Sequence, residues 1–469
     1  MTKLEKTQDL NYIIKKYKIK KKAINFNFKE ASKQLLKGND NNNNRYTHYI
    51  HYYPGRIYPY IPLYILSLQD FSHLSGYLLD PFAGSGTILL ESIMNPFVKR
   101  NALGVEINPL AQLISKVKTT PIDLLKAKEL IYDLKVLYSQ RTGISENVPK
   151  YRNINLWFSS ASIKKLSKLK YAIDNLDAPI EYKDFFWLCF SSIIRKVSKA
   201  DPYIPPPVIL KPEKYKGNPT KYRKLKQHLE EAENPDVWNT FEKNVNDNIT
   251  KLNYIFEKII NGGIKAEIIW NDARDIKKAK LNKRGRFNKN IVEELAPNSV
   301  DIIFTSPPYL TAQKYIRTCK LELLWLGHDE EEINNLDKMS IGTERVSSQM
   351  DIRELGVISI DTLVKNTVSK SKSRGLTVYL YFKDMLKVFE ELNRILKREG
   401  YLILVVGDNK VLGEWISTYK LLSDAATNKG FKEILILKDK IRNRSMMTKR
   451  NGSGGLIKEE YVIILKKEA

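Results

Sequence analysis

A strand-like run that ends in two prolines and a tyrosine is the first feature of this sequence that suggests chemistry. The run at 300–304, which is apolar apart from Asp301, leads through one threonine into Ser306, Pro307, Pro308 and Tyr309. Neither proline can donate a hydrogen bond to a sheet, and each restricts the residue before it, so the strand must end there. Taken alone, such a corner is more often a polyproline-like turn, but its place after this strand and downstream of a glycine turn favours a functional role.

A glycine turn lies earlier in the chain, in the segment DPFAGSGT at 80–87. It follows a strand-like run and opens a helix-like one, and Gly84 and Gly86 let the backbone approach a ligand closely. Glu106 ends the next predicted strand, 20 residues after Gly86, where an acidic side chain can accept both hydroxyls of a ribose. Because Leu89 replaces the third glycine of the dinucleotide fingerprint, the pattern favours a nucleoside without a pyrophosphate.

An alternative reading of the same segment is structural. Glu106 can be an acid near a helix N-terminus, with Asn108 as the capping residue of that helix. A Walker-type GK[ST] sequence is absent, which argues against a nucleoside triphosphatase.

Alternating strand-like and helix-like stretches predict how these residues are positioned. The alternation covers 46–120 and resumes over 263–469, which predicts an α/β fold with a doubly wound, mostly parallel sheet. Two strand-like runs near the C-terminus have no helix between them and predict an antiparallel hairpin closing one edge. We expect a basic N-terminal segment at 1–45, a mostly helical insertion at 121–262 and a polar insertion at 328–375.

The composition favours a polyanionic partner. The 469 residues have a formal charge of +25, which suits nucleic acid, although lysine-rich codon usage is an alternative source of that charge. The two cysteines, Cys189 and Cys319, have no paired spacing, which argues against a disulfide framework or a cysteine-based zinc site. The longest apolar stretch, at 57–68, is too short to span a bilayer, so we expect a cytoplasmic protein.

Four motifs in order give the chain a specific resemblance. DPFAGSGT, GVEINPLA, NDARD and TSPPY resemble the S-adenosylmethionine-dependent DNA amino-methyltransferases, which modify cytosine N4 or adenine N6. HYYPGRIYPYIPLYIL at 51–66 is similar to the segment that precedes the glycine turn in that family. The resemblance implies a Rossmann-like methyltransferase fold, S-adenosylmethionine as cofactor, double-stranded DNA as partner and no metal ion. A restriction–modification system is the expected setting, with a cognate restriction endonuclease as a candidate partner.

The resemblance also assigns roles to individual residues. The residues expected to contact the cofactor fall into four groups. They lie around its methionine part (Asp80, Phe82, Gly84, Gly86 and Thr87), its ribose (Glu106), its adenine (Asn108, Pro109 and Asp272) and its carboxylate (His51, Tyr53 and Pro54).

The same resemblance gives the proline corner a chemical task. An exocyclic base amine is a poor nucleophile because its lone pair is delocalised into the ring, and two hydrogen-bond acceptors beside the amine free that lone pair. The implied acceptors are the Ser306 oxygen and the main-chain carbonyl of Pro307, held in place by Pro308, with Tyr309 stacked on a flipped base. Serine at the first corner position favours cytosine N4 over adenine N6. Neither cysteine follows a proline, which argues against methylation at cytosine carbon 5.

Two other functions remain open from the sequence, namely an RNA base-amine methyltransferase and an inactive methyltransferase-fold protein that binds DNA. We expect target recognition from 121–262, with 328–375 as a second contributor. Basic stretches at 211–226, 277–290 and 368–375 are candidate phosphate contacts, although each can equally be a solvated surface.

Overall fold

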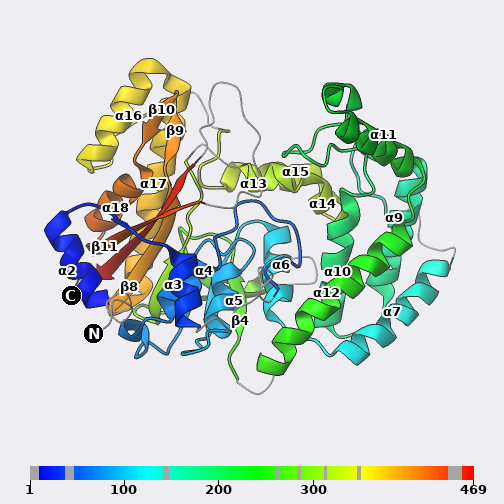
Figure 1. Cartoon of the computed structure of the whole chain (residues 1–469). Helices are drawn as coiled ribbons and strands as arrows, with labels where there is room; N and C mark the ends of the chain where they lie inside the picture. Colours follow the sequence, from blue (N-terminus) through cyan, green and yellow to red (C-terminus); the bar gives the residue numbers. More distant parts are fainter. Residues whose placement is uncertain are drawn as a thin grey trace.

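A mixed sheet is the frame on which the molecule is arranged (Figure 1). The computed structural model describes residues 10–36, 47–140, 147–259, 263–281, 287–310, 314–345, 350–441 and 457–468. Within them, eight strands form this sheet in the spatial order β1 (Ile24–Asn25), β11 (Phe431–Lys440), β12 (Glu459–Lys467), β8 (Leu396–Gly407), β7 (Val300–Thr305), β2 (Leu78–Asp80), β3 (Ala102–Val105) and β4 (Ala266–Trp270). Strand β12 is antiparallel to both neighbours, and the other pairs are parallel.

The predicted doubly wound, mostly parallel sheet and its antiparallel hairpin, β11–β12, are therefore confirmed. The N-terminal segment adds one short strand outside the hairpin, because β1 pairs in parallel with β11. The backbone N–H of Phe26 donates to the Lys438 carbonyl at 2.8 Å, and that of Phe28 donates to the Asp439 carboxylate at 3.1 Å. The helices on either side of β1 are α2 (Leu10–Lys20) and α3 (Phe28–Leu35).

Successive residues of the central strands point to opposite faces of the sheet, as the pleat requires. In β7, Ile302 and Phe304 pack on the face covered by α5 (Thr87–Ile93), while Ile303 packs on the face covered by α17 (Lys372–Ile395). Because both faces are covered, these strands are mostly apolar rather than alternating regularly with polar residues. The helices that complete the two layers are α4 (Tyr60–Leu66), α6 (Pro109–Thr119), α16 (Ile358–Lys370) and α18 (Thr418–Asn428).

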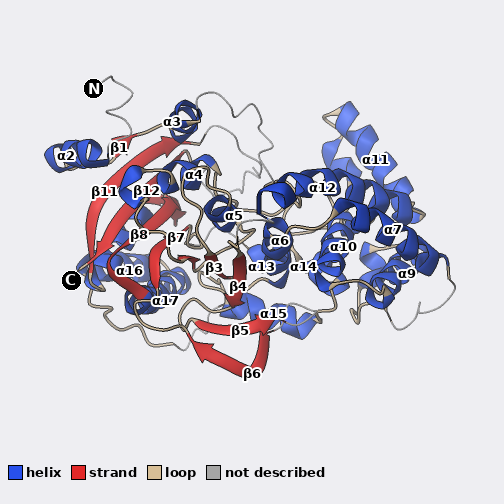
Figure 2. Ribbon diagram, turned by 90° about the horizontal axis from the view of Figure 1, so that it is seen from below, coloured by secondary structure: helices blue, strands red, loops and turns tan. Residues whose placement is uncertain are grey.

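Helices fill the segment between α6 and β4, which confirms the predicted helical insertion (Figure 2). They surround a separate core that contains Phe185, Phe186, Phe190 and Phe241, and the helix α14 (Lys320–Trp325) adds the buried Trp325 to it. The helices are α7 (Leu124–Ser139), α8 (Ile154–Trp157), α9 (Ser160–Asn175), α10 (Ile180–Ile194), α11 (Pro219–Glu233) and α12 (Val237–Ile259).

Shorter elements complete the described fold. They are the 3₁₀ turns η1 (Gln69–Phe71) and η2 (Pro212–Tyr215), the helices α13 (Tyr315–Thr318), α14 (Lys320–Trp325) and α15 (Glu330–Met339), and the antiparallel pairs β5 (Lys277–Leu281) with β6 (Phe287–Glu294) and β9 (Asn409–Val411) with β10 (Glu414–Ile416). Part of the basic stretch at 277–290 thus forms a hairpin, and 282–286 lie outside the described residues. Among the described helices, none has the length and apolar character needed to cross a membrane.

The glycine turn joins β2 to α5 with little space to spare. Gly86 precedes α5 with φ of +71°, in the left-handed region that favours glycine. A Cβ at this position would lie 2.2 Å from Ser115 Oγ and 3.0 Å from Ser115 Cα, on the neighbouring helix α6. Gly86 therefore lets α5 and α6 pack closely beneath the turn.

We expect Gly86→Ala to lower the melting temperature more than Gly413→Ala. Both glycines have positive φ, so both substitutions introduce backbone strain of about 1 kcal/mol, but a Cβ at Gly413 would meet nothing within 4 Å. The overlap with Ser115 should add about 1–3 kcal/mol to the cost at Gly86. Calorimetric unfolding of both variants measures this difference, and equal destabilisation would show that the contact with α6 is unimportant.

Candidate active site

A cavity of about 740 Å³, including its open mouth, lies at the carboxyl ends of β2, β3, β4 and β7. In an open α/β sheet, ligands bind at this edge, where successive connections leave the first strand in opposite directions. Here β2 is that strand, since it lies between β3 and β7. The predicted residues that line the cavity are Tyr53, Phe82, Gly84, Glu106, Asn108, Asp272, Ser306 and Pro308.

Glu106 is held in the cavity wall by main-chain groups. The N–H of Gly84 donates to Oε2 at 2.7 Å, and the N–H of Asn108 donates to Oε1 at 2.8 Å. Burial raises the pKa of Glu106 to about 7, against the effect of these hydrogen bonds. Each carboxylate oxygen keeps a further lone pair, so the arrangement can accept two hydroxyl donors from a ligand.

Asn108 has both a structural and a ligand-facing position, because it caps a helix and also lines the cavity. Its side chain caps α6 by accepting a hydrogen bond from the N–H of Leu110 at 3.1 Å. Its amide also donates to the Tyr53 hydroxyl at 3.2 Å, and both residues line the cavity. The cap therefore fixes the end of β3 and places Asn108 beside the ligand space.

Asp80 lies behind the cavity rather than on its lining, with 2% of its surface exposed. Its Oδ1 accepts hydrogen bonds from Thr305 Oγ1 at 2.6 Å and from the N–H of Phe82 at 3.1 Å. Burial raises the pKa of Asp80 to about 7. Because Thr305 directly precedes Ser306, this carboxyl ties the glycine turn to the proline corner.

The proline corner faces the same cavity from the end of β7. Ser306 and Pro308 are on the lining, whereas Pro307 is buried and Tyr309 is half-buried. The Ser306 side chain is a hydrogen-bond partner of the Tyr309 hydroxyl, and burial raises the pKa of Tyr309 well above its usual value. Tyr309 is therefore a neutral phenol, positioned by the residue at the start of its own corner.

Arg274 and Tyr315 are two of the lining residues that the sequence did not predict. Arg274 donates from Nε and Nη2 to the two carboxylate oxygens of Asp272, both at 2.9 Å, and from Nη1 to Asp384 at 3.1 Å. Tyr315 faces Tyr53 with ring centroids 6.4 Å apart and ring planes 17° from parallel. Neither residue belongs to a spacing pattern, although Arg274 lies inside the NDARD motif.

The remaining predicted residues support the cavity from outside its lining. Gly86 packs against α6, Thr87 is buried at the start of α5, and Pro109 is buried at the first turn of α6. Pro54 is also buried.

His51 is likewise beside the cavity without lining it. Its Nδ1 lies 2.6 Å from the Tyr52 carbonyl oxygen and its Nε2 lies 3.0 Å from Ser191 Oγ. Burial lowers the pKa of His51 to about 4, so the imidazole is neutral at physiological pH. Of the segment expected near the cofactor carboxylate, the lining includes Tyr53 and its near neighbour Gly55.

The side chains that line the cavity fit a nucleoside better than a phosphorylated ligand. Arg274 is the lining cation among the described residues, and two carboxylates already engage it. Apolar walls come from Phe82, Val105 and Ile341, beside the two acceptor oxygens of Glu106. Within the described residues, no group of three histidine, cysteine or acidic side chains could hold a metal ion. S-Adenosylmethionine, which has a ribose and no phosphate, is compatible with this set.

Burial also separates the two cysteines from nucleophilic chemistry. It raises the pKa of Cys189 to about 12 and raises that of Cys319 still further. Neither thiol would be ionised near neutral pH, in agreement with the absence of a proline–cysteine motif.

Comparisons with known proteins agree with these features. No family model matches the chain. It is 28% identical to the type II methyltransferase M.MvaI of Kocuria varians over 448 residues, covering 91% of this chain and 92% of that protein. It is 25% identical to M.AvaI of Nostoc (82% and 80% covered) and 24% identical to M.BsoBI of Geobacillus stearothermophilus (81% and 78%).

The solved structures that match overlap this chain only in part. TTHA0409 of Thermus thermophilus, a predicted DNA modification methylase in complex with S-adenosyl-L-methionine, is 17% identical with a TM-score of 0.20, covering 37% of this chain and 50% of that one. The fold assignment therefore depends on the strand order and on the sequence relatives. Over most of its length, this chain is therefore similar in sequence to type II methyltransferases.

Proposed function

We propose that this chain is a DNA methyltransferase that transfers the methyl group of S-adenosylmethionine to the exocyclic amine of a flipped base, with cytosine N4 favoured over adenine N6. One observation supports this proposal above the others. The glycine turn with Glu106 and the corner that begins at Ser306 border the same cavity, although some 200 residues separate them. The homology to type II DNA methyltransferases supports duplex DNA as the substrate.

In this proposal Glu106 holds the ribose. Its carboxylate is already oriented by the N–H groups of Gly84 and Asn108, so the ligand meets a fixed pair of acceptors. Asp272, which Arg274 holds in one orientation, would accept a hydrogen bond from the adenine amine. When bound, the cofactor supplies an electrophilic methyl group on its sulfonium sulfur.

The corner prepares the other reactant. Ser306 Oγ and the Pro307 carbonyl would accept hydrogen bonds from the two N–H groups of the target amine, which localises its lone pair toward the methyl group. The amine would attack the methyl carbon as the bond from that carbon to sulfur breaks, and the methylated amine would then release one proton to solvent or to a nearby acceptor. Pro307 and Pro308 hold the corner rigid because their φ angles are locked. The Asp80–Thr305 hydrogen bond keeps this corner at a constant position relative to the turn that binds the cofactor.

The identity of the base rests on one side chain. Serine at the first corner position favours cytosine, so we propose N4-methylcytosine as the product. We also propose that 121–262 recognise the target sequence, with 328–375 contributing. A cognate restriction endonuclease is the expected partner, and the enzyme would act in the cytoplasm, where the DNA lies.

Methyl transfer can be measured directly. With methyl-tritiated S-adenosylmethionine, the purified chain should label duplex DNA of varied sequence and leave transfer RNA unlabelled. Nucleoside digestion followed by mass spectrometry should then give N4-methylcytosine. Labelling of transfer RNA without labelling of any duplex would contradict the DNA assignment, and N6-methyladenine would contradict the proposed base.

Substitutions in the corner should separate catalysis from cofactor binding. Ser306→Ala removes one acceptor and should lower turnover by about 10²–10³-fold. Tyr309→Ala removes the stacking face and should lower it by roughly 5–150-fold, which corresponds to about 1–3 kcal/mol per stacked base, whereas Tyr309→Phe should keep most of it.

Calorimetric titration should give a cofactor dissociation constant close to that of the unchanged chain for each of these variants. Ser72→Ala is the matched control for loss of a hydroxyl, because Ser72 is exposed and its hydroxyl donates to the nearby Gln69 carbonyl. Loss of cofactor binding in Ser306→Ala would show that the corner belongs to the cofactor pocket instead.

Cofactor affinity should depend on pH through Glu106. Burial raises its pKa to about 7, and the ribose hydroxyls need the ionised carboxylate. Affinity should therefore be full above pH 7 and fall as pH decreases below it, by up to about tenfold per pH unit. Glu106→Gln should bind weakly with a flat profile, whereas Asp80→Asn should keep the dependence. If the unchanged chain binds the cofactor with the same affinity from pH 5 to pH 8, this role of Glu106 is contradicted.

A further inference from the structure

A concentrated basic surface lies at one end of the helical insertion. We call residues 211–226 the basic ridge, which comprises η2 and the first half of α11. This ridge contains seven lysine or arginine residues (Lys211, Lys214, Lys216, Lys221, Arg223, Lys224 and Lys226), while Glu213 is its one acidic residue. The side chains of six of the seven are exposed, and Lys221 is half-buried.

The charge on α11 is divided along the helix. The second half has Glu230, Glu231 and Glu233, and it is the half attached to the rest of the insertion. Glu233 pairs with Lys199 at 2.6 Å, and the Ala232 carbonyl accepts a hydrogen bond from Ser162 Oγ at 3.1 Å. The acidic half of α11 is therefore attached to the insertion, and the basic half extends away from this attachment. A helix that was merely solvated would not need its charges to be divided in this way.

The positive charge of the ridge is not neutralised by neighbouring side chains. Within the described part of the chain, none of its lysine or arginine side chains forms an ion pair, whereas Arg317 on α13 and Lys320 on α14 pair with Asp337 and Glu330. Repulsion among unpaired cations opposes folding modestly, and a polyanion relieves it on binding. An unpaired basic cluster on a fixed element is the expected electrostatic footprint of a phosphate backbone.

An aromatic pair underlies the ridge and fixes its centre. Lys221 Nζ lies 4.0 Å from the ring centroid of Tyr203 and 4.1 Å from that of Tyr215. The Tyr215 hydroxyl donates to Asp201 at 2.6 Å, so the pair is attached to the proline-rich loop before it. Tyr203 remains 51% exposed, which leaves part of its ring available to a sugar or a base.

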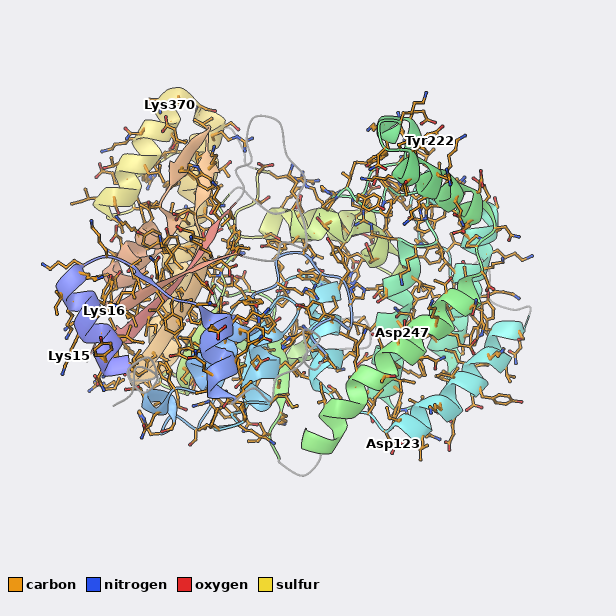
Figure 3. All side chains as sticks on the ribbon, viewed as in Figure 1. Lys15, Lys16, Asp123, Tyr222, Asp247 and Lys370 are labelled. Atoms are coloured by element: carbon orange, nitrogen blue, oxygen red, sulfur yellow. The ribbon has the colours of Figure 1, made fainter. Side chains whose placement is uncertain are left out.

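The ridge lies on the same side of the molecule as the elements that follow the carboxyl end of β8. Figure 1 shows α11 at the top of the helical part, on the same side as β9 and β10, which directly follow the carboxyl end of β8. Helices α13 and α15, whose residues border the cavity, lie between these two parts. In Figure 3, Tyr222 on α11 is at this upper side, whereas Lys15 and Lys16 on α2 are at the lower left, far from it.

We propose that the basic ridge binds the phosphate backbone of duplex DNA while a base occupies the cavity, an inference that rests on the proposed function. Contacts of this kind position the duplex and set its register without reading its sequence. The ridge thus gives the helical insertion a defined task, which is to hold one flank of the duplex, and it leaves base recognition to other surfaces.

The test compares two sets of four lysine or arginine substitutions. The ridge variant is Lys214→Gln, Lys216→Gln, Arg223→Gln and Lys224→Gln, and the control variant is Lys15→Gln, Lys16→Gln, Lys18→Gln and Lys20→Gln on α2. All eight side chains are exposed. Dissociation constants for a mixed-sequence DNA duplex and a matched RNA duplex are measured at several salt concentrations. Calorimetric titration with S-adenosylmethionine reports whether each variant keeps its fold and its cofactor site.

We expect the ridge variant to bind duplex DNA about tenfold or more weakly than the unchanged chain at low salt. Its slope of log affinity against log salt should fall by up to about 3.6, because each lost phosphate contact removes about 0.9. Cofactor affinity should be unchanged, and the control variant should bind DNA like the unchanged chain.

Three results would overturn this assignment. The first is equal loss of DNA affinity in both variants, which would indicate a general effect of charge. The second is unchanged DNA affinity in the ridge variant while the unchanged chain methylates DNA, which would refute the ridge and leave the proposed function intact. The third is failure of the unchanged chain to bind or methylate any DNA duplex, with binding to RNA instead, which would refute both.

Discussion

The hydrogen bond between Thr305 and Asp80 joins the two halves of the site. Each residue ends a parallel strand, β7 and β2, which are neighbours in the sheet although more than 200 residues separate them in sequence. One residue after Thr305 the proline corner begins, and within four residues of Asp80 the glycine turn reaches the cavity. The sheet register therefore determines the distance between the two, and everything proposed about transfer from a cofactor to a base depends on that distance being constant.

Burial of acidic groups accompanies this arrangement. Asp80 and Glu106 both have pKa values raised to about 7, because each carboxylate has been taken out of water. Main-chain N–H donors offset part of that cost and also hold the carboxylates in one orientation. The buried carboxylates thus lower the stability of the ligand-free protein. They also provide acceptors that are already oriented for a ligand, a combination that is common in functional sites.

Local patterns in the sequence predicted the parts of the site that local structure creates. Glu106, Asn108 and the glycine turn belong to strand–turn–helix units whose geometry follows from neighbouring residues, and the corner at Ser306 ends a strand by proline chemistry alone. Arg274 and Tyr315 escaped prediction because their positions depend on long-range packing. Arg274 reaches Asp384 on α17, and Tyr315 packs where Gly55 leaves room for its ring, since a Cβ on Gly55 would lie 2.8 Å from a ring carbon. Likewise β1 joins the sheet through pairing with β11, more than 400 residues away.

The central claim is that one cavity holds the cofactor with its ribose on Glu106 and its methyl group toward the corner at Ser306. A crystal structure of the complex with S-adenosylmethionine measures this directly. We predict both ribose hydroxyls on the Glu106 carboxylate, the adenine near Asp272, and the methyl group facing Ser306 across the space left for a base. A cofactor bound with its ribose away from Glu106, or with its methyl group directed away from the corner, would contradict this claim.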